Sequence, residues 1–355
     1  MVGDSSYGAM SIEELVKFFQ TGKVVGFPTD TVYGMGCILS EDCVAKLREL
    51  KKGREKPFAV FVPDVDSAKE LVEEFPNYIN SLIKKHWPGG LTLIFRAKKG
   101  LPPGVVSGEG KIGIRIPDFP PLIEAMKRVG SPVINTSANL PGEVPPVSHK
   151  DVRVPLELML KGDSKGGIPS TVVDVSGERP VIIRMGAVKV FEIEAITGKT
   201  ILLSEGNVLN ILYVCSGNTC RSPMAQYHLS YCARDLPLFI RSCGTLGFSG
   251  SPATENAIKV MEEIGVNLTA HRSTPISREL IQWADLILPM EPVHREEVLS
   301  LGANPYTILP FYEIIDLEKI PDPIGKDIEF YREVRDLIVK GNRWLEKHLR
   351  ERFNP

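Results

Sequence analysis

Short apolar runs alternate with amphipathic stretches along the whole chain. In residues 40–53, Val44, Leu47 and Leu50 recur at helical spacing, Ser40 is placed to cap the segment, and lysines and Gly53 follow its end. This pattern predicts a helix. Apolar, β-branched runs predict strands at 23–27, 58–62, 91–95, 111–117, 132–135, 171–175 and 180–185. So many strands with few helices predict a large, twisted, mixed α/β sheet.

A second pattern starts at residue 208. Residues 208–214 are typical of a buried strand, and a loop of small residues and the start of a helix follow them. Further on, the sequence predicts a helix at about 253–264, a strand at 285–290 and a long amphipathic helix at about 327–350. This alternation of strands and helices indicates a parallel sheet. We therefore expect two α/β domains, residues 1–190 and 208–355, joined by a linker at 191–207.

Composition narrows the choice of class. The 355 residues suit two domains, and the net charge of −2 does not indicate a nucleic-acid-binding protein. No apolar run reaches 18 residues, and the N-terminus lacks the pattern of a signal peptide, so we expect a cytoplasmic protein without membrane association. The six cysteines lack zinc-type spacing, so we expect free thiols and no metal site.

The stretch VCSGNTCRSP, residues 214–223, carries the first candidate chemistry. Cys215 follows a strand, and Ser222 and Pro223 are typical of a helix N-cap and first turn. The loop residues between them should let backbone N–H groups converge on an anion: Ser216, Gly217, Asn218, Thr219 and Cys220. The same field would lower the pKa of Cys215, and Arg221 could hold two phosphoryl oxygens. The pattern predicts a cysteine nucleophile, against the alternative of a buried cysteine and a surface arginine.

These residues resemble the low-molecular-weight protein phosphatase family, whose loop reads C-x5-R-S. The resemblance covers about 208–350 and implies a four-stranded parallel sheet flanked by helices. The family uses a distant Asp-Pro as general acid, which implies that Asp322, in PDPIG, protonates the leaving group and then activates water.

Two positions bear on the phosphatase substrate. Thr219 stands where tyrosine phosphatases of the family usually carry an aliphatic residue, and Ile324-Gly325 replaces their aromatic pair. The loop therefore resembles the branch that hydrolyses phosphoarginine on proteins, although arginine phosphatases carry Phe at the position of Ile324. A tyrosine phosphatase remains the alternative. Cys220 is either a packing residue or a disulfide partner for Cys215.

Polar and basic groups also gather at predicted strand ends in the first half of the chain. Their segments are GFPTDTVYGMG (26–36), KKGREKP (51–57), NTSANLPG (135–142), PSTVVDV (169–175) and IIRMG (182–186), with Arg115 after another strand. Cations and hydroxyls at the ends of strands in an α/β sheet suit a polyphosphate ligand. No Walker-type phosphate loop is present.

Together these segments resemble the YrdC/Sua5 family of threonylcarbamoyl-AMP synthases over about residues 10–190. The resemblance implies synthesis of threonylcarbamoyl-adenylate and pyrophosphate from L-threonine, bicarbonate and ATP, with Mg²⁺ accompanying the ATP. It implies partners in tRNA or in the transferase machinery that modifies adenosine 37. An RNA-binding or regulatory module is the alternative for this half.

The same resemblance implies roles for individual residues. The threonine-binding residues would be Thr31, Arg115, Asn135 and Ser170, and the ATP-binding residues Lys52, Arg54, Lys56, Ser137, Asn139 and Arg184. Two departures concern this site: the stretch between Arg54 and Pro57 is shorter than in the family, and Phe61 stands where some members carry histidine.

Overall fold

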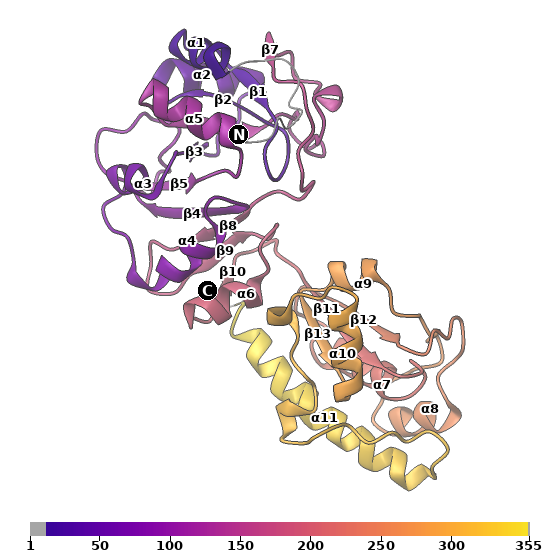
Figure 1. Cartoon of the computed structure of the whole chain (residues 1–355). Helices are drawn as coiled ribbons and strands as arrows, with labels where there is room; N and C mark the ends of the chain where they lie inside the picture. The colour runs from indigo at the N-terminus through magenta and orange to yellow at the C-terminus, as the bar shows by residue number, and fades with distance from the viewer. Residues whose placement is uncertain (1–11, 354–355) are drawn as a thin grey trace. The chain divides into compact units, whose positions relative to one another are not determined.

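The computed structural model describes residues 12–353. Residues 1–11 and 354–355 lie outside the described residues, and with them the outer ends of both predicted domains and most of the stretch inspected for a signal peptide. The chain divides into an N-terminal unit, which runs to Val188 and includes Ile196–Thr200, and a C-terminal unit of Lys189–Ala195 and the residues from Ile201 on (Figure 1). None of the described helices is long and apolar enough to cross a membrane.

The N-terminal unit is built on one mixed sheet. Its strands are β1 (Val25–Phe27), β2 (Gly34–Ile38), β3 (Ala59–Phe61), β4 (Leu91–Arg96), β5 (Lys111–Arg115), β6 (Val133–Ser137), β7 (Leu158–Met159), β8 (Thr171–Asp174) and β9 (Val181–Arg184). They pair in the order β9-β8-β4-β5-β3-β6-β2-β1-β7, with parallel and antiparallel neighbours. This confirms the mixed sheet that the sequence predicts.

Strand β2 was not predicted, because its sequence GMGCI is rich in glycine and small residues. The structure explains one of these glycines. A Cβ on Gly36 would lie 2.3 Å from the carbonyl oxygen of Ile134 on the neighbouring β6. The close approach of two backbones therefore excludes the side chain that would have marked the strand.

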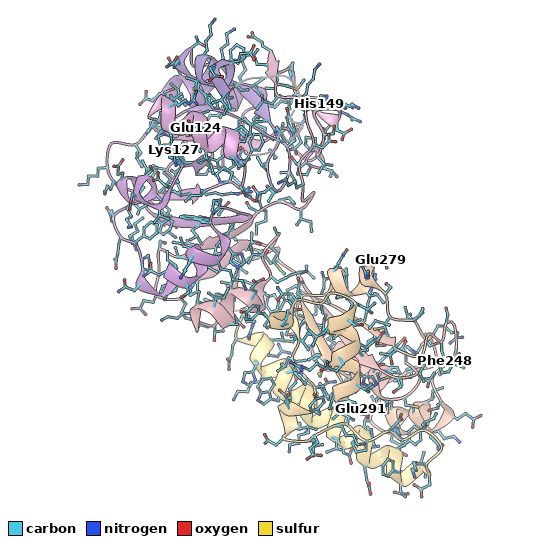
Figure 2. The ribbon with its side chains drawn as sticks, in the orientation of Figure 1. Glu124, Lys127, His149, Phe248, Glu279 and Glu291 are labelled. Carbon is cyan, nitrogen blue, oxygen red and sulfur yellow. The ribbon has the colours of Figure 1, made fainter. Side chains whose placement is uncertain are left out.

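Helices cover part of one face of this sheet. The unit contains α1 (Ile12–Gln20), α2 (Glu41–Leu50), α3 (Val65–Leu71), α4 (Asn80–His86) and α5 (Pro120–Val129), with 3₁₀ turns η1 (Asn77–Ile79) and η2 (His149–Asp151). Helices α1 and α5 pack on side chains of β1, β3 and β6, while Glu124 and Lys127 of α5 point outward (Figure 2). Ser40 caps α2 as predicted, since its Oγ accepts the N–H of Cys43.

The C-terminal unit has a parallel sheet in the order β12-β11-β13, formed by β11 (Leu209–Cys215), β12 (Leu238–Gly244) and β13 (Leu286–Pro289). The other elements are α6 (Val190–Thr197), of which this unit includes the part up to Ala195, and β10 (Leu202–Leu203), α7 (Arg221–Cys232), α8 (Glu255–Glu262), α9 (Arg278–Trp283), α10 (Pro292–Ser300), η3 (Pro305–Thr307), η4 (Glu313–Ile315) and α11 (Ile328–Arg350). Helix α6 and strand β10 occupy part of the segment predicted as a linker.

Two expectations for this unit need correction. The phosphatase resemblance implied four strands, but the described sheet has three, and Ile308 forms only an isolated parallel bridge to Ile287 beside β13. The N–H groups of Leu309 and Phe311 continue that edge by donating to the carbonyl oxygens of Ile287 and Pro289. Ser222 does not cap α7. The helix begins at Arg221 with Cys220 at the N-cap, because the Ser222 hydroxyl instead contacts the Cys215 sulfur.

We predict that Gly244→Ala damages the cysteine loop. The added methyl group would lie 2.7 Å from the carbonyl oxygen of Ser216 and 2.9 Å from the amide nitrogen of Asn218, so the loop backbone must move. Overpacking of this kind costs about 1–3 kcal/mol, and denaturant unfolding of the C-terminal unit should show it together with lost phosphatase turnover. Gly108→Ala, whose methyl meets nothing within 4 Å, is the control. Unchanged turnover in Gly244→Ala would refute the close contact.

Candidate active sites

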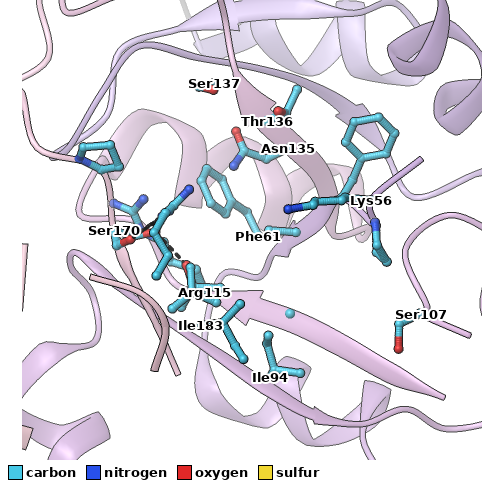
Figure 3. A pocket seen from close by; sticks show the side chains of 18 of the residues that line it. Lys56, Phe61, Ile94, Ser107, Arg115, Asn135, Thr136, Ser137, Ser170 and Ile183 are labelled. Carbon is cyan, nitrogen blue, oxygen red and sulfur yellow. Dashed lines mark hydrogen bonds between the residues drawn. The ribbon is translucent and has the colours of Figure 1, made fainter. Parts of the chain in front are cut away.

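The uncovered part of the N-terminal sheet forms the floor of a cavity of about 640 Å³ (Figure 3). The strand registers place Thr92, Ile94, Gly113, Arg115 and Asn135 on one face, and all five line the cavity. It is also lined by the predicted residues Thr31, Arg54, Lys56, Ser137, Ser170 and Arg184. The structure therefore brings most of the proposed synthase residues together on one sheet face.

Arg115 is the most deeply buried cation of this cavity, at 4% exposed. Its Nη1 donates to Thr31 Oγ1 at 2.9 Å, its Nε to the carbonyl oxygen of Gly89 at 2.8 Å, and its Nη2 to Asp30. Sequence reasoning missed Asp30, which also accepts the N–H of Asp118. These contacts neutralise the guanidinium and fix its orientation.

Arg184 and Ser170 form a second pair in the cavity. Arg184 Nη2 donates to the Ser170 carbonyl at 2.7 Å and to its hydroxyl at 3.0 Å, and that hydroxyl also contacts Thr92 Oγ1 at 2.9 Å. Burial lowers the pKa of Arg184 to about 10, and repulsion by Arg115 and Arg54 adds to the shift. Because Arg115 and Arg54 repel Arg184, an anion in the cavity would offset this repulsion.

The cations of the basic loop after α2 have different surroundings. Arg54 reaches the cavity and donates to Thr136 Oγ1 at 3.1 Å, and Lys56 lines the cavity too. Lys52 is exposed and is not among the lining residues. Its neighbour Lys51 is buried instead, with its Nζ 3.1 Å from Asn139 Oδ1, and burial lowers the pKa of Lys51 to about 8.

Asn139 and Asn135 have different surroundings. Asn139 is not among the residues that line the cavity. Its Oδ1 accepts a hydrogen bond from the hydroxyl of Ser137, which does line the cavity. Asn135 points into the cavity, and its Oδ1 is buried with no hydrogen-bond partner among the described residues (Figure 3). A buried acceptor without a partner costs free energy, so it marks a place for a ligand that donates a hydrogen bond.

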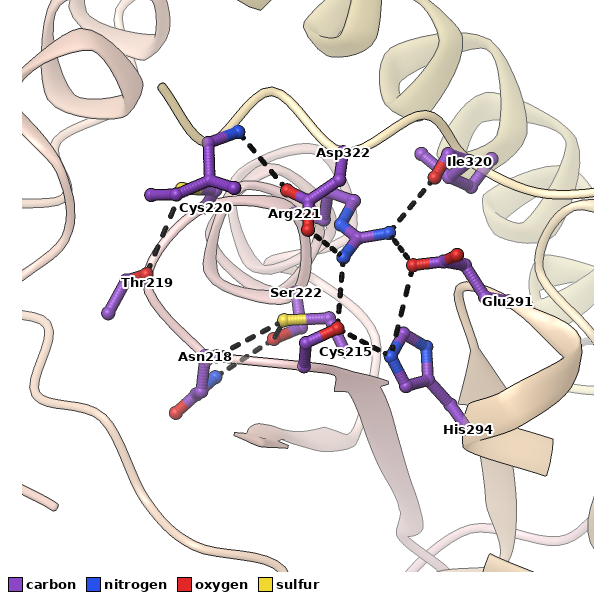
Figure 4. A network of polar contacts seen from close by, with 12 residues as sticks. Cys215, Asn218, Thr219, Cys220, Arg221, Ser222, Glu291, His294, Ile320 and Asp322 are labelled. Carbon is purple, nitrogen blue, oxygen red and sulfur yellow. Dashed lines mark hydrogen bonds and ion pairs between the residues drawn. The ribbon is translucent and has the colours of Figure 1, made fainter. Parts of the chain in front are cut away.

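The cysteine loop of the C-terminal unit forms a compact network (Figure 4). Cys215 Sγ lies 2.9 Å from Ser222 Oγ and accepts the N–H of Asn218 at 3.2 Å. The Asn218 amide group donates to Ser222 Oγ and to Ser242 Oγ. His271 Nε2 lies 2.7 Å from the Asn218 carbonyl oxygen. This network of hydrogen bonds holds Cys215 at the end of β11, next to the first turn of α7.

The pKa of Cys215 differs from the expectation. Burial raises it, because the side chain is 2% exposed, while the Ser222 hydroxyl, the charge of Arg221 and the Asn218 amide act in the opposite direction. The prediction of a lowered pKa considered only the loop N–H groups and the helix N-terminus, and did not include the effect of burial.

Arg221 lies beneath the loop, 1% exposed, and contacts two carboxylates. Its Nη2 donates to Asp322 Oδ2 at 2.6 Å and to Ser216 Oγ at 3.2 Å, and its Nη1 donates to Glu291 and to the Ile320 carbonyl oxygen. Cys215, Arg221 and Asp322 therefore meet in one place, as sequence reasoning expected. Glu291, from the residues just before α10, was missed.

His294 was missed as well. Its Nε2 lies 2.9 Å from Ser216 Oγ. The Ser216 hydroxyl accepts a hydrogen bond from Arg221, so its O–H group can donate a hydrogen bond to His294 Nε2. Burial, together with the nearby Arg221, lowers the pKa of His294 to about 4, so the ring stays neutral at pH 7. Its Nδ1 is buried with no partner among the described residues.

Cys220 and Thr219 face away from Cys215. Cys220 Sγ lies 3.3 Å from the Tyr331 hydroxyl and 3.4 Å from Thr254 Oγ1, and Thr219 Oγ1 lies 3.8 Å from the same sulfur. All six cysteines have free thiols. Gly217 completes the loop, and a Cβ there would be 3.3 Å from Thr219 Oγ1.

Comparisons with known proteins match each unit separately. Residues 17–186 match the Sua5/YciO/YrdC family model, described as telomere recombination, and residues 210–354 match the model of low molecular weight phosphotyrosine protein phosphatases. A Bacillus subtilis protein named threonylcarbamoyl-AMP synthase is 33% identical over 195 residues, which are 53% of this chain and 56% of that protein. The chain thus spans about half the length of this curated relative.

Two solved structures complete the comparison. Pyrococcus abyssi Sua5 complexed with L-threonine covers 94% of both chains at 19% identity and a TM-score of 0.52, which is a likeness of fold. The YwlE arginine phosphatase from Geobacillus stearothermophilus is 32% identical, covers 40% of this chain and 94% of its own, and has a TM-score of 0.37. The chain therefore belongs to the Sua5/YciO/YrdC family in its N-terminal unit, fused to a member of the low-molecular-weight phosphatase family in its C-terminal unit.

Proposed function

We propose that residues 1–190 make L-threonylcarbamoyladenylate and pyrophosphate from L-threonine, bicarbonate and ATP, for transfer to adenosine 37 of tRNA by separate machinery. One observation carries this proposal: Arg54, Arg115 and Arg184 all line one cavity. Burial lowers the pKa of each of these arginines, and repulsion by the other two lowers that of Arg184 further. The triphosphate of ATP and the carboxylate of threonine are anionic groups that could pair with these arginines. The name of the B. subtilis relative, threonylcarbamoyl-AMP synthase, supports the same reaction.

The proposed roles follow from the contacts. Asp30, Thr31 and Gly89 use three donors of Arg115. A guanidinium has five N–H donors, so N–H groups of Arg115 remain for the threonine carboxylate. Thr31, Asn135 and Ser170 offer hydroxyl and amide groups to the rest of the amino acid.

The ATP phosphates would lie at the other cations. Arg54 and Lys56 would hold the phosphates and stabilise pyrophosphate as it leaves, with Arg184, Ser137 and Asn139 on the nucleotide. Lys51 supports this end of the cavity through Asn139. Lys52, which points to solvent, would act only if the loop closes on the bound nucleotide.

Mg²⁺ fits this cavity as a partner of the nucleotide. No cluster of three or more metal-ligating side chains occurs among the residues that the structure describes, and Asn135 Oδ1 is a buried oxygen without a partner. Mg²⁺ commonly keeps several waters and binds through substrate phosphates, which needs few protein ligands. When bound with ATP it would neutralise part of the triphosphate charge.

We also propose that residues 208–355 hydrolyse phosphorylated proteins through a cysteinyl phosphate. The Cys215 sulfur would attack phosphorus, and the loop N–H groups and Arg221 would hold the phosphoryl oxygens. Asp322 would take up the proton that the Cys215 thiol loses and give it to the leaving nitrogen or oxygen. It would then take a proton from the water that breaks the sulfur–phosphorus bond and releases phosphate. The carrying observation is the contact of Asp322 with Arg221, beside Cys215.

Phosphoarginine is the substrate that we propose for this unit. The loop carries Thr219 where tyrosine phosphatases of the family usually have an aliphatic residue, and the YwlE relative is named an arginine phosphatase. Phosphotyrosine is the second candidate, because the matching family model carries that description.

The synthase proposal predicts pyrophosphate release that depends on L-threonine, in the presence of ATP, bicarbonate and Mg²⁺. Arg54→Ala and Arg184→Gln should each lower kcat/KM for this release by about one to two orders of magnitude, since each removes a charged hydrogen bond. The matched control is Arg179→Ala, an exposed arginine outside the cavity lining. Threonine-independent release, or release that survives both cavity substitutions, would contradict the assignment and favour the RNA-binding alternative.

The phosphatase proposal predicts that Cys215→Ser reduces turnover of an aryl phosphate to background and leaves pyrophosphate release intact. Cys232→Ser, which alters a thiol at the far end of α7, is the control. Wild-type protein should hydrolyse a phosphoarginine peptide with a higher kcat/KM than the matching phosphotyrosine peptide. Equal or faster turnover of the phosphotyrosine peptide would contradict the phosphoarginine preference and favour a tyrosine phosphatase.

A further inference from the structure

A second hollow in the C-terminal unit has no part in the chemistry above. It measures about 530 Å³ and lies between α7 and α11, with Ile264 after α8 closing one side. Helix α7 contributes His228 and Tyr231, and α11 contributes Val339, Lys340, Arg343 and one carboxylate, Asp336. Helices α7, α8 and α11 lie together in this unit (Figure 1). We call this hollow the α7–α11 groove.

The tautomer of His228 is set by its neighbours. Asn342 Nδ2 donates to the Ala225 carbonyl at 2.8 Å, which fixes the orientation of the Asn342 amide, because a carbonyl can only accept. The same Nδ2 lies 3.3 Å from His228 Nδ1, so that ring nitrogen is the acceptor. Tyr213 of β11 donates to Asn342 Oδ1 and locks the arrangement.

The proton of the neutral His228 ring is therefore on Nε2. That nitrogen has no hydrogen bond to any of the residues that the structure describes, although the side chain is only 7% exposed. His228 lines the groove. A largely buried ring thus presents to the groove an N–H donor that a ligand oxygen could accept.

The charges around this donor are also unbalanced. The arginines of α11 at 332, 335 and 350 each pair with carboxylates, whereas Lys340 and Arg343 have no ion pair within the described part of the chain. The carboxylates nearby are already engaged, because Asp336 pairs with Arg335 and Glu346 with Arg350. Burial lowers the pKa of His228, and the charge of Arg343 lowers it further, while Glu346 acts in the opposite direction.

We propose that the α7–α11 groove binds the phosphate group of a small phosphate ester. Lys340, Arg343 and the His228 Nε2–H would hold the phosphate oxygens, as cations and N–H donors do at other phosphate sites. Ile264, Val339 and the Tyr231 ring would contact the organic part. The groove is larger than inorganic phosphate needs and falls within the usual range of small-ligand cavities, which favours an ester over the free ion.

NMR of the full chain, with its six histidines labelled at Cε1, tests the groove directly. The probes are adenosine monophosphate and inorganic phosphate, titrated at constant pH, and His228→Gln assigns the signal. His271 and His294 contact the cysteine loop, so their signals report phosphate bound there separately. We expect the His228 signal to shift and saturate, at lower concentration with adenosine monophosphate than with phosphate.

The double variant Lys340→Ala, Arg343→Ala should weaken the His228 response by about tenfold or more, since it removes both cations. Both side chains are exposed, and unchanged signals from the other histidines would show that the fold is intact. Lys347→Ala, an exposed cation on α11 outside the groove, is the matched control. A His228 signal that stays fixed with both probes, or shifts equally in the double variant, would overturn the proposal.

Discussion

Each unit of this protein is organised by a guanidinium held out of water. Arg115 is 4% exposed and Arg221 is 1% exposed. Removing a charge from water costs far more free energy than a fold of this size can lose, unless carboxylates and carbonyl oxygens surround the charge. Asp30 does this for Arg115, and Glu291 and Asp322 do it for Arg221. The strands and loops that carry these partners are therefore fixed by the need to neutralise a buried cation.

The same constraint connects the fold to the proposed chemistry. Asp322, the proposed general acid, contacts the arginine that is proposed to hold the phosphate. A phosphate that binds Arg221 would take over the Nη2 donor, and Asp322 would then be free to protonate the leaving group. The arginine would stay neutralised throughout, because one anion replaces another. Ser216 accepts from the same Nη2, and Glu291 and the Ile320 carbonyl hold Nη1 on the other side of the guanidinium through this exchange.

Sequence reasoning found residues that belong to local motifs and missed residues that act across the fold. Cys215, Arg221 and the loop between them could be predicted because strand, small residues and helix follow one another directly. Asp30 and Glu291 could not, because their roles exist only where distant segments meet: Asp30 is 85 positions from Arg115, and Glu291 is 70 from Arg221. His294 and the Asn342–His228 contact have the same origin.

Two differences between expectation and structure come from single-residue geometry. Lys51 and Lys52 are neighbours of the same residue type, so the sequence does not distinguish them. At the end of α2 the side chain of Lys51 is buried, while Lys52 has a φ of 50° and points to solvent. Ser222 looked like a helix cap because Pro223 follows it, yet its hydroxyl serves the Cys215 sulfur. A pattern of residue types cannot separate such neighbours, since turn geometry decides which side chain faces inward.

The inhibition constant of inorganic phosphate against aryl phosphate hydrolysis, compared between wild type and Asp322→Asn, tests this account most directly. If Asp322 occupies Arg221 until phosphate replaces it, the substitution removes a competing anion and its repulsion of phosphate. Phosphate should then inhibit the variant more tightly, by about tenfold, even as turnover of poor leaving groups falls. An inhibition constant that is unchanged or weaker in Asp322→Asn would contradict the exchange of anions on the buried arginine.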